Sequence, residues 1–70
     1  MSLRTKIREL RLRDRLSQEE LAQRVGVRRE TIGHLENGHY NPSLKLAMDI
    51  AKVFDTTVED IFFFFDESAS

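Results

Sequence analysis

Hydrophobic residues recur along most of the chain at intervals of three and four, which is the spacing of one face of an α-helix. In the first half they mark three segments. The first begins after Thr5, its predicted N-cap, and the other two span residues 18–25 and 28–36. Charged residues fill the positions between them, so each segment is predicted to be an amphipathic helix. The positions predicted to face the core are Ile7, Leu10, Leu16, Leu21, Ala22, Val25, Val27, Ile32 and Leu35.

The second half continues this pattern with a fourth helix, which Pro42 precedes and Ser43 caps. Its predicted core positions are Leu44, Ala47, Ile50, Ala51 and Phe54. Three further residues widen the apolar surface beyond one core face, so part of that surface is expected to meet a second subunit: Leu46, Met48 and Val53. A short fifth helix is predicted to start at Thr57 and to end at Ile61. The pattern as a whole predicts an all-α domain over residues 5–61.

Residues 18–37 carry the features of a helix-turn-helix. Ser17 and Glu20 form an S-x-x-E capping box, which starts a helix. Gly26 can adopt the positive φ that ends a helix before a tight turn. The small Ala22 permits the close approach of two helices that cross near a right angle. A helix-turn-helix is therefore predicted, and a plain helical hairpin is the alternative.

Four consecutive aromatic residues follow the fifth helix: Phe62, Phe63, Phe64 and Phe65. Such a run suits a β-strand buried on both faces, and it would favour aggregation if it were left exposed. The strand is expected to pair either with residues near Leu3 of the same chain or across a two-fold axis with another copy. Residues 62–67 are accordingly predicted to be a dimerisation strand, in which Asp66 and Glu67 prevent further strand addition.

The two ends of the chain are given no function. Residues 1–4 are treated as an N-terminal arm, and residues 68–70 are expected to be disordered.

Composition narrows the possible classes of protein. Seventy residues allow one domain with a small core, which dimerisation would help to stabilise. There is no cysteine, and two histidines without other ligands do not argue for a metal, so no metal or cofactor is expected. No apolar run approaches the roughly 20 residues of a membrane span, and a cytoplasmic, nucleoid-associated protein is expected. No nucleophile lies beside a plausible base, so the chain is not expected to be an enzyme.

The charges are divided unequally along the chain. Residues 1–34 contain nine Arg and Lys against five Asp and Glu, a balance of +4, whereas residues 35–70 contain two against seven, a balance of −5. The net charge of −1 therefore conceals a basic half that carries the predicted helix-turn-helix. A basic surface of this kind can face phosphate, although a solvated charged surface is the alternative interpretation.

Three segments carry a resemblance to a known family: LSQEELAQRVGV, TIGHLENG and YNPSLKLAMDIAKVF. Over about residues 5–62 the chain resembles the Cro/CI-type (XRE) helix-turn-helix family of phage repressors and small prokaryotic regulators. The resemblance implies a compact, lambda-repressor-like five-helix DNA-binding domain with its dimer interface at the C-terminal end. It also implies a structural ion pair between Arg11 and Glu36, to which no contact with DNA is assigned.

The outward side of the recognition helix, residues 28–36, is expected to enter the major groove. Arginine can donate twice to guanine, glutamate can accept from cytosine N4, and histidine can donate to guanine. The predicted base-contacting residues are Arg28, Arg29, Glu30, Gly33 and His34. Arg28 stands where the family usually has a Ser or Thr cap, and Glu30 where it commonly has glutamine, so base preference cannot be carried over from relatives. Gly33 either lets the backbone approach DNA closely or is merely tolerated in the helix.

A second set of residues is predicted to contact the DNA backbone: Ser17, Gln18, Asn37, His39, Tyr40 and Asn41. Gln18 opens a helix whose N-terminus favours an anion. In the family a glutamine at this place either touches the DNA backbone or braces the recognition helix. The loop over residues 37–42 is expected to offer free N–H groups and side-chain donors to phosphate. The alternative for His39 and Tyr40 is that they only cover the core.

Taken together, the sequence predicts a sequence-specific regulator that binds double-stranded DNA as a homodimer on a palindromic operator. Repression of transcription is the expected output, and a DNA-binding antitoxin is a variant within the same class. No membrane or small-molecule partner is expected. The alternative from another class is a protein-interaction module that keeps the fold and docks a partner through residues 62–65.

Overall fold

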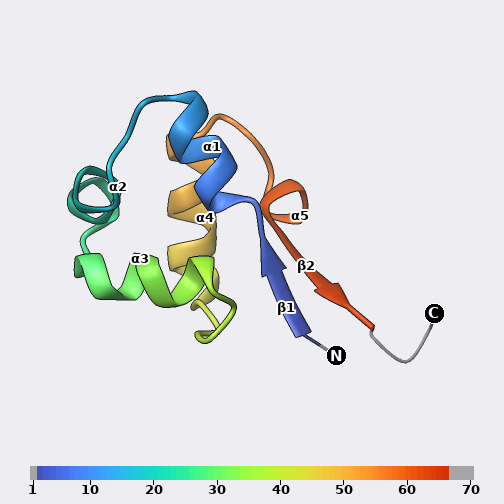
Figure 1. Cartoon of the computed structure of the whole chain (residues 1–70). Coiled ribbons are helices and arrows are strands. Elements are labelled where there is room, and N and C mark those ends of the chain that lie inside the picture. The colour runs from blue at the N-terminus through green and yellow to red at the C-terminus, as the bar shows by residue number, and fades with distance from the viewer. Residues whose placement is uncertain (1, 67–70) are drawn as a thin grey trace.

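The computed structural model describes residues 2–66, which fold into five helices and a two-stranded sheet (Figure 1). Glu67 and the predicted disordered tail over residues 68–70 lie outside the described residues. The predicted helical architecture is confirmed. The elements in chain order are β1 (Ser2–Thr5), α1 (Ile7–Arg13), α2 (Gln18–Val25), α3 (Arg29–Glu36), α4 (Leu44–Val53), α5 (Val58–Ile61) and β2 (Phe62–Phe65).

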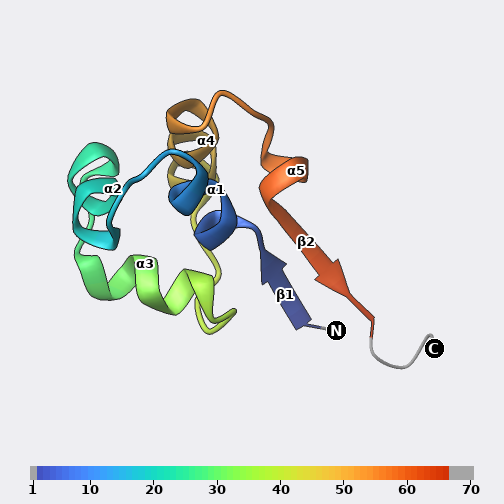
Figure 2. The same cartoon turned by 45° about the horizontal axis from the view of Figure 1, so that its top comes forward.

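The helices form one body with two distinct ends. Helices α1 and α4 lie in the middle, with α2 and α3 on one side of them (Figures 1 and 2). Helix α5 and the sheet lie on the other side, and the N-terminal part of the chain runs beside the C-terminal part. The helix-turn-helix and the phenylalanine strand are therefore at opposite ends of the domain.

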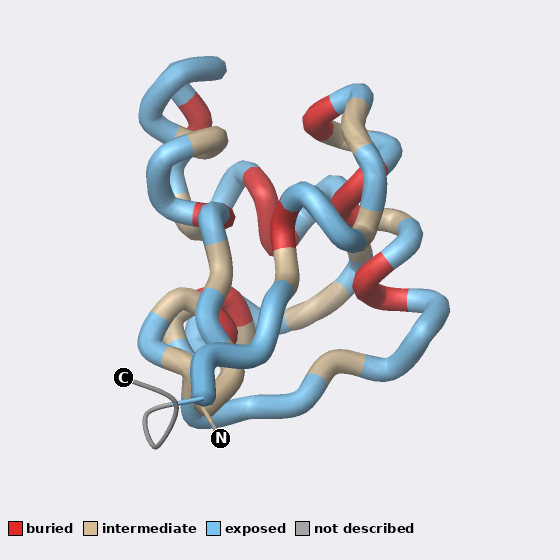
Figure 3. The backbone as a smooth tube through the Cα atoms, turned by 90° about the vertical axis from the view of Figure 1, so that its right-hand side faces the viewer, coloured by how far each residue is buried: buried red, intermediate tan, exposed pale blue. Residues whose placement is uncertain are grey.

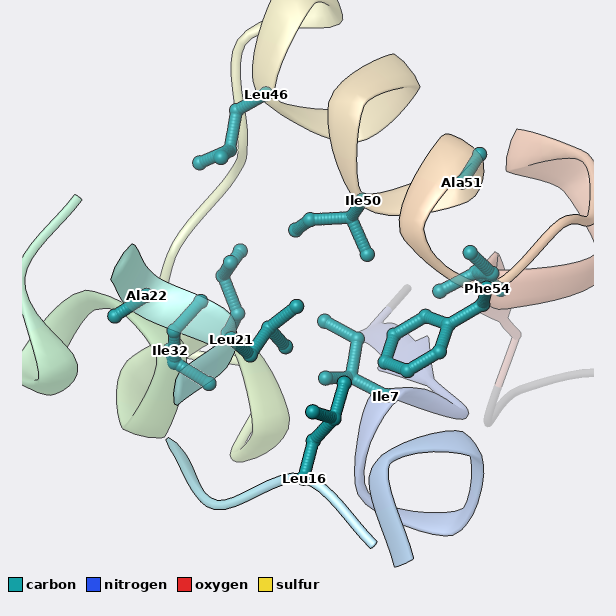
Figure 4. Packing of buried hydrophobic residues seen from close by; sticks show 11 residues of the cluster. Ile7, Leu16, Leu21, Ala22, Ile32, Leu46, Ile50, Ala51 and Phe54 are labelled. Carbon is teal, nitrogen blue, oxygen red and sulfur yellow. The ribbon is translucent and has the colours of Figure 1, made fainter. Parts of the chain in front are cut away.

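The core forms where the apolar faces of the helices meet. Ile7, Leu21 and Ile50 point toward a common centre, and Phe54 closes one side of it (Figure 4). Buried stretches of the backbone lie where helices face one another, whereas strand β2 near the C-terminus is mostly exposed (Figure 3). Strand β1 is mostly half-buried. No helix within residues 2–66 is long and apolar enough to span a bilayer.

One predicted core position is wrong. Leu44 is 73% exposed, while Leu46, which was expected at the side, is buried. Successive residues of a helix are separated by about 100°, so Leu44 and Leu46 lie roughly 160° apart around α4. The face of α4 that carries Leu46 and Ile50 is the one turned toward the core, and Leu44 projects from the first turn.

The polar residues that begin α2, α4 and α5 act as predicted. Ser17 Oγ accepts a hydrogen bond from the Glu20 N–H at 3.0 Å, and Glu20 Oε1 accepts one from the Ser17 N–H at 2.9 Å, which completes the capping box. Ser43 and Thr57 likewise accept from the backbone three residues ahead. Thr5 is not the N-cap of α1, because it is the last residue of β1 and Lys6 takes the cap position. Its Oγ1 nevertheless accepts a bond from the Ile7 N–H at 3.4 Å.

Strand β2 pairs antiparallel with β1 of the same chain, with Phe64 opposite Leu3 and Phe62 opposite Thr5. The structure thus shows the first of the two predicted arrangements, in which the N-terminal arm pairs with the phenylalanine strand. The prediction of burial on both faces is wrong for a single chain. A sheet of two short strands at the edge of the domain has no layer over its outer side, and Phe63, Phe64 and Phe65 are 41%, 64% and 49% exposed.

Candidate nucleic-acid interface

Helix α3 divides its residues between the core and the surface. Ile32 and Leu35 are buried among α1, α2 and α4, because the helical spacing brings them to the same face. The predicted base-contacting residues lie on or beside the other face. Arg28, Arg29, Glu30 and His34 are exposed, and Gly33 is partly buried.

Helix α3 starts without a side-chain cap. Arg28 occupies the N-cap position in an extended conformation, and its side chain forms no capping hydrogen bond. Two arginines therefore stand at the end of the helix where backbone N–H groups already create a positive potential. This placement is unfavourable for the isolated helix and favourable for contact with an anion.

Gly33 has room for a side chain within the chain itself. A Cβ added there would lie 3.8 Å from Gln18 Nε2, which is ordinary van der Waals contact, and the glycine has no positive φ. Intramolecular packing therefore gives no reason for a glycine at this helical position, where it costs about 1 kcal/mol relative to alanine.

Arg29 is the predicted base-contacting residue with the most contacts to neighbouring side chains. Its Nη1 donates to Gln18 Oε1 at 3.4 Å, and its Nη2 lies 3.7 Å from Glu30 Oε1. The Arg29 side chain is still 53% exposed. It can therefore donate to a ligand while the chain holds it from two sides.

The expected ion pair between Arg11 and Glu36 is present behind this surface. Arg11 Nε donates to Glu36 Oε2 at 2.8 Å, and the two side chains are only 12% and 7% exposed. Arg11 Nη1 also donates to the Leu16 carbonyl at 3.0 Å, and Gln18 Nε2 donates to Glu36 Oε1 at 3.1 Å. This cluster joins α1, α2 and the last turn of α3.

The loop after α3 exposes four of the predicted backbone-contacting side chains: Asn37, His39, Tyr40 and Asn41. Its first N–H groups are not free, however, which corrects the expectation from the sequence. The N–H groups of Asn37, Gly38 and His39 donate to the carbonyls of Gly33, Leu35 and His34 and thereby close the end of α3.

Gly38 fixes this loop against strand β1. It has a φ of +73°, and a Cβ there would lie 2.6 Å from the Leu3 carbonyl oxygen. The sequence signals a left-handed turn at Gly38 but gives no sign of this contact, because the contact depends on the strand formed by the first residues.

The ionisable residues around α2 are consistent with local stabilisation. The pKa of the Glu20 carboxyl lies below its usual range because the Ser17 N–H and hydroxyl bond to it. Within residues 2–66, acidic residues are not confined to one end of the domain: four lie on α2 and α3 (Glu19, Glu20, Glu30 and Glu36), and four follow α4 (Asp55, Glu59, Asp60 and Asp66).

Comparison with known proteins agrees with this geometry. The sequence model of the family described as Helix-turn-helix matches residues 7–61. The chain belongs to the Cro/CI-type helix-turn-helix family. Its relatives in this family include an uncharacterized HTH-type transcriptional regulator of Archaeoglobus fulgidus, which is 62% identical over 65 residues, or 93% of this chain and 92% of that protein. The HTH-type transcriptional regulator YgzD of Bacillus subtilis is 44% identical over 94% of this chain and all of its own length.

A solved structure from the same class has the same fold. The restriction-modification controller protein C.AhdI from Aeromonas hydrophila is 36% identical, with a TM-score of 0.72 over 79% of this chain and 83% of that one. Together with the named relatives, this likeness identifies the chain as a DNA-binding regulator of the Cro/CI-type family.

Proposed function

We propose that the chain binds a specific double-stranded DNA sequence as a homodimer and represses transcription by occluding a promoter. The observation that carries the proposal is the outer side of α3, where Arg28, Arg29, Glu30 and His34 are exposed together on a helix-turn-helix. A recognition helix in the major groove reads bases with side chains of these types. A cytoplasmic location at the nucleoid follows from this function.

The contacts are divided between bases and phosphates. Arg29 and Glu30 read base edges, with support from Arg28 and His34, and Gly33 lets the helix backbone approach the groove. The flanking phosphates are bound at the start of α2 and by the loop after α3. The residues proposed for this backbone contact are Ser17, Gln18, Asn37, His39, Tyr40 and Asn41. Since three N–H groups of the loop are used within the chain, its side chains carry most of this binding.

Dimerisation is supported by an apolar surface over β1, β2 and the start of α4, which adjoins the loop after α3 at Asn41 and Pro42. Phe64 and Leu44 are 64% and 73% exposed, and both line a groove of about 320 Å³ whose walls are largely apolar. The other residues that line this groove are Leu3, Asn41, Pro42, Ala47, Val58 and Phe62. An exposed apolar surface of this kind is typical of an interface, and the Phe62–Phe65 strand, with Phe62, Phe63, Phe64 and Phe65, is proposed to form its centre.

A two-fold dimer built in this way would present two α3 helices to one side of the DNA. Two half-sites about 34 Å apart, one helical turn, would then form an approximate palindrome.

Selection of bound duplexes from a random pool, followed by sedimentation of the complex, tests the proposal. The expected result is a two-fold symmetric motif bound by two chains. If no motif is enriched and binding is weak and salt-sensitive, the chain is instead a protein-interaction module that docks a partner through its phenylalanine strand.

A further inference from the structure

We propose that the cavity between strand β1 and the loop after α3 binds a phosphate of the DNA backbone, with Arg4 as its main contact. This inference rests on the proposed function, since the phosphate belongs to the operator. It gives a ligand to the first residues of the chain, to which the sequence assigned no function.

The cavity has a volume of about 420 Å³ and lies at the surface. Strand β1 forms one wall, and the end of α3 with the loop that follows it forms the other. Polar and charged residues from both walls line it: Ser2, Arg4, Thr5, Glu36, Asn37 and His39. A polar cavity of this kind suits a charged or strongly polar group rather than an apolar one.

The two walls are held together by the contact between Gly38 and β1. A Cβ on Gly38 would lie 2.6 Å from the Leu3 carbonyl oxygen, so the loop approaches the strand this closely only because residue 38 is a glycine. Leu3 is paired in turn with Phe64 of β2. The N–H groups of Asn37 and His39 are bonded to carbonyls of α3, which fixes the loop from its other side. The cavity is therefore formed before any ligand binds.

Arg4 supplies the positive charge of the cavity. Its side chain is exposed, and its guanidinium carbon lies over the Phe65 ring, 5.2 Å from the ring centroid. This cation–π contact restricts the long side chain beside the cavity. Arginine suits a phosphate because its planar guanidinium can donate two hydrogen bonds to phosphate oxygens. The hydroxyl of Ser2 and the amide of Asn37 can donate to the same group.

The carboxylate of Glu36 does not exclude an anion from this place. Within residues 2–66 it is the only acidic side chain that lines the cavity. Its charge is balanced on the inner side, where Arg11 Nε donates to it at 2.8 Å and Gln18 Nε2 at 3.1 Å. The Glu36 side chain is only 7% exposed. The charge that the cavity presents to a ligand is therefore mainly that of Arg4.

The position of the cavity identifies DNA as the source of the phosphate. The start of β1 lies level with α3 and the loop after it in both views (Figures 1 and 2). Asn37 and His39, which line the cavity, are among the residues proposed to contact the DNA backbone. Strand β1 also lies between the end of α3 and β2, the centre of the proposed dimer interface. In a two-fold dimer the two cavities would thus face phosphates on the inner side of each half-site.

The test neutralises the phosphates of the selected operator one at a time. Each is replaced by an uncharged methylphosphonate at symmetric positions of the two half-sites, and dissociation constants are measured for the unmutated chain, Arg4→Gln and Arg8→Gln. Arg8→Gln is the matched control, because Arg8 is an exposed arginine on α1 that does not line the cavity. The modified and unmodified operators are compared within each variant, so a change in dimer stability that affects both duplexes equally does not alter the ratio.

Neutralising the inner phosphate should weaken binding of the unmutated chain by roughly three- to tenfold. This loss should disappear in Arg4→Gln, whereas the losses at other phosphates should remain. Arg8→Gln should keep every loss, and Arg4→Lys, which keeps the charge, should keep most of them. Arg4→Gln should also reduce the slope of log K against log salt concentration by about 0.9 per chain, or roughly 1.8 for two chains, without changing base discrimination.

Three results would count against the proposal in distinguishable ways. If every methylphosphonate affects Arg4→Gln as it affects the unmutated chain, Arg4 binds no phosphate, although specific binding through α3 still stands. If the loss disappears only at phosphates on the outer side of the half-sites, the cavity does not lie between the two recognition helices. If the unmutated chain does not prefer the operator to random duplex, the proposed function fails as well.

Discussion

Removing one partner of the ion pair between Arg11 and Glu36 should cost a large part of the stability of this domain. Arg11→Met would remove both Arg11 donors from the Glu36 carboxylate, whose side chain is 7% exposed, and would leave the Gln18 amide bonded to it. Removing one partner of a buried pair typically costs about 3 to 5 kcal/mol. A domain of 70 residues has roughly 4 to 10 kcal/mol of unfolding free energy in total, so the variant should be close to unfolding.

Urea denaturation followed by circular dichroism at a fixed protein concentration measures this loss. The matched control is Arg13→Met, because Arg13 also pairs with a carboxylate at 2.8 Å, that of Asp14, but the side chains are 55% and 34% exposed. The control should lose no more than about 1 kcal/mol. Replacing both members of the buried pair, Arg11→Met with Glu36→Leu, should restore much of the stability lost in Arg11→Met. The prediction is refuted if Arg11→Met loses no more unfolding free energy than Arg13→Met. It is also refuted if the double variant loses as much as Arg11→Met and Glu36→Leu lose when their separate losses are added.

Three further predictions concern other parts of the chain. Gly33→Ala should raise the unfolding free energy by about 0.5 to 1 kcal/mol, and weaker operator binding by the same variant would support a close approach of DNA there. Phe64→Asp should shift the mass measured by sedimentation toward the monomer. Leu12→Asp, a control at an exposed residue on α1, should leave the mass unchanged. If neither variant changes the mass, the dimer interface lies elsewhere. The lowered pKa of Glu20 means that its bond from Ser17 stabilises the fold fully above pH about 4.5 and that this contribution disappears as the pH falls through the folded value. Glu20→Gln should therefore reduce the slope of the unfolding free energy against pH in the acid range. If the slope is the same as in the unmutated chain, the Glu20 carboxylate does not stabilise the fold through this cap.

The sequence predicted those helix boundaries that depend on local side-chain chemistry. Ser17, Ser43 and Thr57 begin helices because their hydroxyls accept from N–H groups three residues ahead, and Gly26 ends one because it adopts a φ of +73°. Arg15 and Asp55 also adopt left-handed conformations, after α1 and α4. Neither was predicted. Arginine rarely adopts this conformation, whereas aspartate is one of the residues enriched in it, so only Asp55 carries a weak signal in its residue type.

Features that depend on contacts between distant segments were predicted less completely. Pairing of Phe62–Phe65 with residues near Leu3 was one of two predicted arrangements, and the sequence could not decide between them. The close approach of Gly38 to the Leu3 carbonyl was not predicted, because it depends on that pairing. Leu44 points outward because of how α4 is rotated about its axis. Apolar residues cover so much of this helix that the sequence alone does not determine which face is turned toward the core.

The sequence predicted which side chains of α3 lie at its surface, but not the contacts between them and α2. Spacing alone brings the side chains of Arg28, Arg29 and His34 to the surface of α3. The bonds of Gln18 to both Arg29 and Glu36 join residues from two helices, and they follow from the crossing of α2 and α3.

We propose that two copies of this chain bind one specific DNA sequence through α3. An equilibrium titration of the selected operator and a scrambled duplex of equal length, with the stoichiometry measured at two salt concentrations, tests this. Two chains should bind per operator, with a preference for the operator over the scrambled duplex of about a thousandfold or more. Equal affinity for both duplexes, lost together as the salt concentration rises, would contradict it.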